Sequence, residues 1–128
     1  MIGDSYACNP RNPRPGTVYQ SAYNPIDLYG DDIEVDYRGY EVTVDNFIRV
    51  VTGRLPPSTP ESKRLNTDQY SNILVYMTGH GGDGFLKFQD DNELSSIELA
   101  DVVNQMWLRR RYNFLSYFIY IDTMKCFW

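Results

Sequence analysis

The sequence has little of what metal-binding, nucleic-acid-binding and membrane-spanning proteins use. It has one histidine, and its two cysteines, Cys8 and Cys126, stand near opposite ends with no CxxC spacing, which argues against a His/Cys zinc site. Acidic residues outnumber basic ones, 17 to 12, for a net charge of −5. Phosphate binding needs a basic face, so no nucleic acid partner is expected.

Signals for membrane insertion or export are also missing. No stretch approaches the roughly 18 consecutive apolar residues of a membrane helix. Residues 1–5 (Met-Ile-Gly-Asp-Ser) do not form an apolar run behind a basic start, so they do not resemble a signal peptide. By its own signals, the chain is expected to carry no membrane anchor and to remain where it is synthesised.

The composition present is that of a folded domain. Hydrophobic residues make up 42% of the 128 residues and aromatic residues 15%, which a disordered chain would not have. This length suits one small domain, so residues 1–128 are interpreted as a single domain. The proline-rich segment 9–16 can be neither a helix nor a central strand.

Two helices are predicted from their ends and periodicity. Thr43 is a plausible N-cap and Gly53 a plausible stop for the first helix, whose apolar stripe is Val44, Phe47, Ile48 and Val51. Ser95 and Glu98 form a capping box for the second, with Leu99, Val103, Met106, Trp107 and Arg110 on one side. Its last residues, Arg109–Arg111, are interpreted as a solvated helix end.

Two continuous apolar runs indicate strands buried on both faces of a parallel sheet. They are Ile73–Met77 and Tyr117–Ile121. Phe85–Phe88 is predicted as a short strand, closed by a turn at residues 90–92. Buried strands joined across a helix predict an α/β fold with a parallel sheet.

The only histidine, His80, lies in a glycine-rich segment, Thr78–Gly84, predicted to begin where the first buried strand ends. Ligands bind at that edge of α/β sheets, and an imidazole there suits general acid–base catalysis. The alternative is a glycine turn with an incidental histidine. The segment also matches GxGxxG, but the dinucleotide fingerprint requires a following helix, and a strand is predicted instead.

Four long segments of the chain resemble one enzyme family. These segments are residues 30–38, 52–60, 72–82 and 84–90. They resemble the catalytic subunits of GPI-anchor transamidases, which are cysteine peptidases related to legumain and the caspases. The resemblance implies a caspase-like, mostly parallel sheet flanked by helices, and residues 1–128 would hold one partial domain of it, incomplete at both ends.

The resemblance also implies an activity. Members of this family act in the endoplasmic reticulum, where they cleave a C-terminal signal peptide from a precursor protein and join the new C-terminus to the amine of a GPI lipid. His80 matches the catalytic histidine, and Gly81 matches a residue whose N–H helps to hold the oxyanion. Other transamidase subunits are then the expected partners, with Cys8 matching a cysteine that forms an intersubunit disulfide. A buried free thiol is the alternative for Cys8.

The chain departs from the family at the nucleophile. The family has its cysteine directly after Asp-Thr, whereas Met124 follows Asp122 and Thr123 here. The segment from Asn113 to Asp122 is also about two residues longer than in the family, which can disturb strand register. Two hypotheses stay open: a transamidase subunit, or a truncated, inactive isoform that only binds a partner. The chain as written is expected to have no acyl-transfer activity, unless Cys126 replaces the missing thiol.

Two acidic residues form a candidate metal site. Glu34 and Asp36 would point to one side of an extended segment, and hard oxygen ligands suit calcium. The resemblance implies a structural calcium site nearby and no cofactor for the chemistry itself. A solvated acidic strand is the alternative, and from the residues alone it is favoured.

Overall fold

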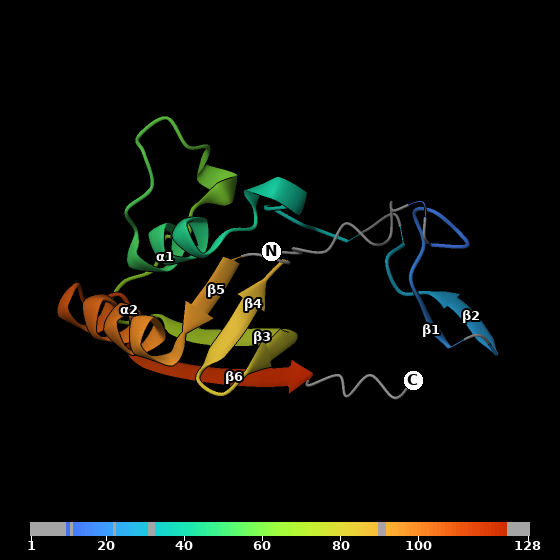
Figure 1. The fold of residues 1–128 in the computed structure, drawn as a ribbon. Coiled ribbons are helices and arrows are strands. Elements are labelled where there is room, and N and C mark those ends of the chain that lie inside the picture. The colour runs from blue at the N-terminus through green and yellow to red at the C-terminus, as the bar shows by residue number, and fades with distance from the viewer. Residues whose placement is uncertain (1–9, 11, 22, 31–32, 90–91, 123–128) are drawn as a thin grey trace. The chain divides into compact units, whose positions relative to one another are not determined.

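The computed structural model describes residues 10, 12–21, 23–30, 33–89 and 92–122 (Figure 1). The chain divides into two compact units, residues 1–42 and residues 43–128. Each unit is described by itself below.

The first unit contains a turn and a short hairpin. The side-chain amide of Asn12 donates to the carbonyl of Thr17 at 2.9 Å, and its Oδ1 accepts from the backbone N–H of Arg14 at 3.1 Å. These bonds hold a proline-containing turn, and no described residue of segment 9–16 lies in a helix or a strand, as predicted. Strands β1 (Tyr19–Ser21) and β2 (Asn24–Asp27) then pair antiparallel, which the sequence pattern did not predict.

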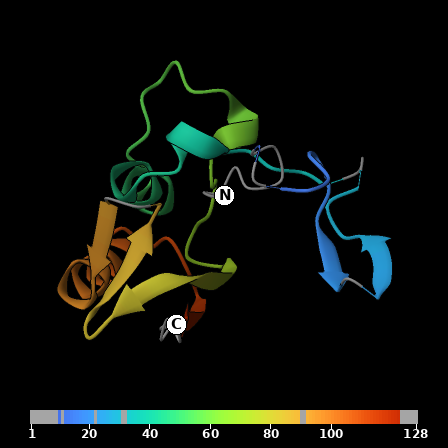
Figure 2. The same ribbon diagram turned by 45° about the vertical axis from the view of Figure 1, so that its right-hand side comes forward.

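The second unit is built on a four-stranded sheet. Its strands are β3 (Asn72–Gly82), β4 (Phe85–Phe88), β5 (Asn92–Ser95) and β6 (Phe114–Asp122), in the order β5-β4-β3-β6. β3 and β6 are parallel, whereas β4 pairs antiparallel with both β3 and β5. The α/β class is confirmed, with a mixed sheet in the described residues rather than a mostly parallel one. The antiparallel β4–β5 hairpin lies beside β3 in both views (Figure 1, Figure 2).

Both helices begin and end at the signals found in the sequence. α1 (Val44–Thr52) has Thr43 as its N-cap, whose hydroxyl accepts from the N–H of Asn46, and it ends at Gly53 with φ of 70°. α2 (Ser96–Leu108) begins at the Ser95–Glu98 capping box. These ends are predictable because a cap satisfies backbone groups within one turn of itself.

The buried face of α2 differs from the predicted one. Val102 and Met106 are its buried residues, whereas Trp107 is exposed. Two short 3₁₀ segments are also present in the described residues. Gly39–Glu41 lies in the first unit, and Glu61–Lys63 follows the proline-rich linker after α1.

Two of the three arginines after α2 reach the carboxyl end of α1. Arg109 donates to the carbonyl of Thr52 at 3.2 Å, and Arg111 donates through Nε to the carbonyl of Val51 at 2.8 Å. A further bond joins Arg111 to the carbonyl of Leu65. Carbonyls at a helix C-terminus carry partial negative charge, so these guanidinium groups complement the end of α1. Arg109 and Arg110 are exposed, as a solvated helix end predicts, whereas Arg111 is half-buried, so that interpretation was wrong for Arg111.

The helices cover one face of the sheet. Phe47 of α1 packs on Phe88 of β4 with ring centroids 5.7 Å apart, and Ile73 and Met77 of β3 are buried on the same side. The opposite face of β3 and β6 is exposed in the described residues. It presents Leu74, Tyr76, Phe118 and Tyr120, each 60–67% exposed. The expectation that both strands are buried on both faces was therefore wrong.

Candidate functional site

His80 lies within β3, and not beyond its end as the sequence suggested. The strand continues through Gly81 and Gly82, which pair with Leu86 and Phe85 of β4. β3 therefore has two neighbours at this point, β6 on one side and β4 on the other. His80 stands near the carboxyl end of the parallel pair, where α/β proteins place ligand sites.

The glycines around His80 allow a close approach of β4. A Cβ on Gly81 would stand 2.4 Å from the carbonyl oxygen of Phe85, and one on Gly82 would stand 2.7 Å from the Phe85 ring. Gly84 has a φ of 80°, in the left-handed region that favours glycine. β4 is a strand, so the helix that dinucleotide binding requires does not follow these glycines.

His80 is exposed, and alternation along β3 places it on the open face of the sheet with Thr78 and Tyr76. Across the β3–β6 pair, its register partner is Asp122. Sequence reasoning missed Asp122, because only the register of two distant strands brings it opposite the histidine.

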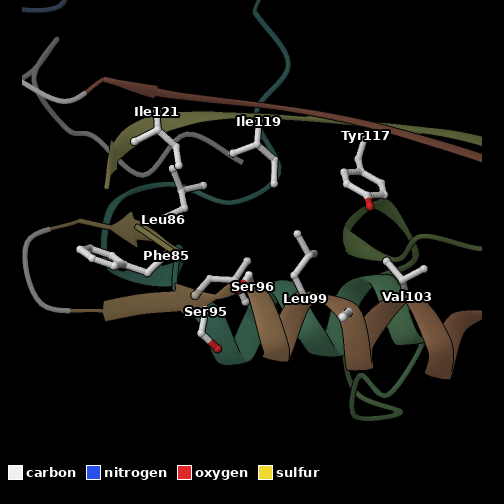
Figure 3. A pocket seen from close by; sticks show the side chains of 12 residues that line it. Phe85, Leu86, Ser95, Ser96, Leu99, Val103, Tyr117, Ile119 and Ile121 are labelled. Atoms are coloured by element: carbon white, nitrogen blue, oxygen red, sulfur yellow. The ribbon is translucent and has the colours of Figure 1, made fainter. Parts of the chain in front are cut away.

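A pocket of about 420 Å³ lies on the other face of the sheet (Figure 3). Ile119 and Ile121 of β6 point into it, Ile119 toward Leu99 of α2 and Ile121 toward Leu86 of β4. Its lining is apolar, and alternation along the strands puts it on the side away from His80. The pocket therefore belongs to the space between helix and sheet and not to the histidine site.

The acidic pair of the first unit is not on a strand. Glu34 and Asp36 are both exposed, with Glu34 in irregular backbone and Asp36 in a bend. Within the part of the chain that the structure describes, no group of three or more His, Cys, Asp or Glu residues could hold a metal ion. The two carboxylates fit calcium in donor type, and a calcium site there stays a prediction.

Three residues that the sequence singled out lie outside the described residues. They are Cys8, Met124 and Cys126. The oxyanion role of Gly81 also stays a prediction, because only the pairing of its backbone with β4 is described.

The position of His80 near the carboxyl end of the parallel pair agrees with the protein family that the sequence matches. A model of the peptidase C13 family matches residues 1–126. The chain belongs to the peptidase C13 family.

Three relatives of this C13 chain are named as GPI-anchor transamidases, one of them as putative. Over 125 residues it is 64% identical to human GPI-anchor transamidase, a match that covers 98% of the chain and 31% of the human protein. A putative GPI-anchor transamidase of Drosophila melanogaster is 61% identical, with 35% of its length covered. GPI-anchor transamidase of Saccharomyces cerevisiae is 57% identical, with 30% covered. The chain therefore spans about a third of the length of the curated relatives it matches.

These matches confirm the family resemblance found in the sequence. None of the helices in the described part of this C13 chain has the length and apolar character needed to span a bilayer.

Proposed function

We propose that this chain is part of a GPI-anchor transamidase, a cysteine-type acyl transferase of the endoplasmic reticulum. The observation that carries the proposal is identity of 57–64% over 98% of the chain to proteins of that name. Its single histidine stands near the carboxyl ends of the parallel strands, where ligand sites form in α/β folds. The substrates are then precursor proteins with a C-terminal GPI signal, and the acceptor is the amine of a GPI lipid.

In the proposed reaction a thiolate attacks the carbonyl at the end of the mature precursor. The bond to the signal peptide breaks, and His80 gives a proton to the departing amine. The resulting thioester is attacked by the amine of the GPI lipid. The amine loses a proton to His80, and the sulfur leaves as the thiolate that began the reaction. The N–H of Gly81 is proposed to stabilise the oxyanion in both steps.

We propose that the chain as it stands does not carry out this reaction. Met124 follows Asp122 and Thr123, and a thioether has no proton to lose and cannot form a thioester that turns over. Losing one member of a nucleophile–base pair costs about as much as losing the whole set. This methionine is the observation that favours the second candidate, an inactive partner-binding form.

The partners of either form would be other transamidase subunits, one of them linked to the chain by a disulfide through Cys8. Non-reducing electrophoresis of the complex tests that link.

The proposed role of His80 is testable in a chimera. Residues 10–89 of the chain would replace the matching segment of the Saccharomyces cerevisiae protein, in cells that lack their own copy, with a GPI-anchored surface reporter as the readout. The chimera should restore anchoring, and His80→Ala should reduce it by about 100-fold or more, because a general acid–base group contributes at least that much. Thr78→Ala, on the same strand and face, is the matched control. Anchoring that survives His80→Ala would refute the catalytic role.

A further inference from the structure

The pairing of β3 with β6 runs without a shift along its whole length. It begins with Asn72 opposite Phe114 and reaches His80 opposite Asp122. The start is fixed by the backbone N–H of Asn113, which donates to the carbonyl of Ser71 at 2.7 Å. The residue that meets His80 across the pair is therefore set from the beginning of β6.

Register decides which position on β6 a reactive group must occupy. Neighbouring strands lie about 4.8 Å apart, and each residue advances about 3.3 Å along the strand. A strand position two residues beyond the register partner of His80 would therefore be about 8 Å away, Cα to Cα. A nucleophile must share a hydrogen bond with its base, within roughly 3 Å, so the register partner is the favoured position.

We propose that position 122 is the place in this chain where a nucleophile would meet His80, and that Asp122 occupies it. This inference rests on the proposed function. The roughly two-residue excess between Asn113 and Asp122, which the family resemblance implies, then shifts Asp-Thr along β6 so that Asp122 stands opposite the histidine. An insertion of two residues keeps every later side chain on its original face, whereas one residue would reverse them. β6 can therefore absorb the insertion with Ile119 and Ile121 still toward the pocket.

Disulfide trapping in the full chain tests the register. In a Cys8→Ser, Cys126→Ser background, the pair His80→Cys with Asp122→Cys is compared with His80→Cys with Met124→Cys. The positive control is Thr78→Cys with Tyr120→Cys, since Thr78 and Tyr120 are also register partners. After mild oxidation, trypsin cleaves at Arg109–Arg111 and separates the two cysteines onto different peptides, so mass spectrometry detects the link.

Disulfides form at Cα separations of about 4.4 to 6.8 Å. The pair at positions 80 and 122 and the control pair should therefore link at least tenfold faster than the pair at positions 80 and 124. Equal linking of the 124 pair, or failure of the control pair, would overturn the register.

Thiol reactivity tests whether position 122 pairs with the imidazole. Single-thiol chains with Asp122→Cys or Met124→Cys keep His80, and their alkylation by iodoacetamide is followed against pH. A histidine beside a thiol lowers its pKa, so the thiol at position 122 should react at least tenfold faster at pH 6 than the thiol at position 124. The advantage should vanish with His80→Gln. Equal rates would overturn the inference. Neither assay reads GPI anchoring, so failure here is distinct from failure of the proposed function.

Discussion

At Gly81 the backbone of the neighbouring strand β4 leaves no room for a side chain. Besides the Phe85 carbonyl oxygen at 2.4 Å, a Cβ there would meet the Cα of Leu86 at 3.3 Å and Cγ2 of Ile121 at 3.1 Å. The two contacts on β4 are with backbone, which cannot move without parting the two strands. Glycine at this position therefore follows from packing alone, whatever its N–H does in catalysis.

Gly81→Ala is expected to destabilise the β3–β4 pair by about 1 to 3 kcal/mol, the usual cost of overpacking. Hydrogen exchange of Phe85–Phe88 should accelerate accordingly. Gly79→Ala is the matched control, because a Cβ there meets the carbonyl oxygen of Lys87 at 3.4 Å, an ordinary contact. Equal exchange in both variants would show that the close approach at Gly81 does not limit the side chain.

At the scale of elements, the local signals were predictable and the pairings were not. Thr43, Gly53 and the Ser95–Glu98 box act within one turn of the backbone, so their sequence pattern is sufficient. β5 was predicted only as a turn followed by a helix cap, because its strand exists through pairing with β4. The continuous apolar run of β3 predicted a strand buried on both faces. In the described residues only one face of β3 is covered. The sequence placed His80 near the carboxyl end of this strand, although beyond the end and not within it, and the partner of His80 on β6 depended on long-range register.

Arg111 supplies one of the two guanidinium groups that join the end of α2 to the end of α1, and Arg109 supplies the other. Arg111→Met would leave the carbonyls of Val51 and Leu65 without this donor. An unsatisfied, part-buried carbonyl costs about 1 to 3 kcal/mol, so faster exchange in the last turn of α1 is expected. Arg110→Met is the control, since Arg110 is exposed and its guanidinium bonds to the side chain of Gln69, at 3.5 Å, and not to α1 among the described residues. An effect of Arg110→Met equal to that of Arg111→Met would contradict this role.

Acid should weaken the start of α2. Glu98 accepts hydrogen bonds from the hydroxyl and the backbone N–H of Ser95, which lower the pKa of Glu98 below its ordinary 4.5. Its contribution to helix stability is therefore fully present above pH 4.5 and is lost as the pH falls through the lowered pKa. Hydrogen exchange at the start of α2, corrected for intrinsic rates, should show this loss, and Glu98→Gln should remove the pH dependence. A dependence unchanged in Glu98→Gln would assign it to another group.

At the scale of the whole molecule, the second unit has an open apolar face and an unpaired edge among its described residues. Leu74, Tyr76, Phe118 and Tyr120 lie on the open face, and β6 has no further strand beyond it in the described sheet. Asp122 is the only charged residue of β6. Contiguous apolar surface and uncharged edges both favour association with other chains. The isolated chain is therefore expected to be poorly stable or aggregation-prone, and cooperative melting of a soluble monomer would count against this.

The open face is expected to cause more association than scattered aromatic residues do. Tyr76→Thr with Phe118→Thr removes two register partners from that face while keeping strand propensity, since threonine is β-branched. Sedimentation velocity should show a shift toward monomer. Tyr23→Thr with Tyr40→Thr is the matched control, because these tyrosines are 98–99% exposed, in the other unit, and single exposed aromatic side chains are ordinary. Association that persists in the first variant would assign it to the edge of β6, whose backbone groups neither substitution changes. Equal solubilisation by both variants would instead show that aromatic content matters and that the face does not.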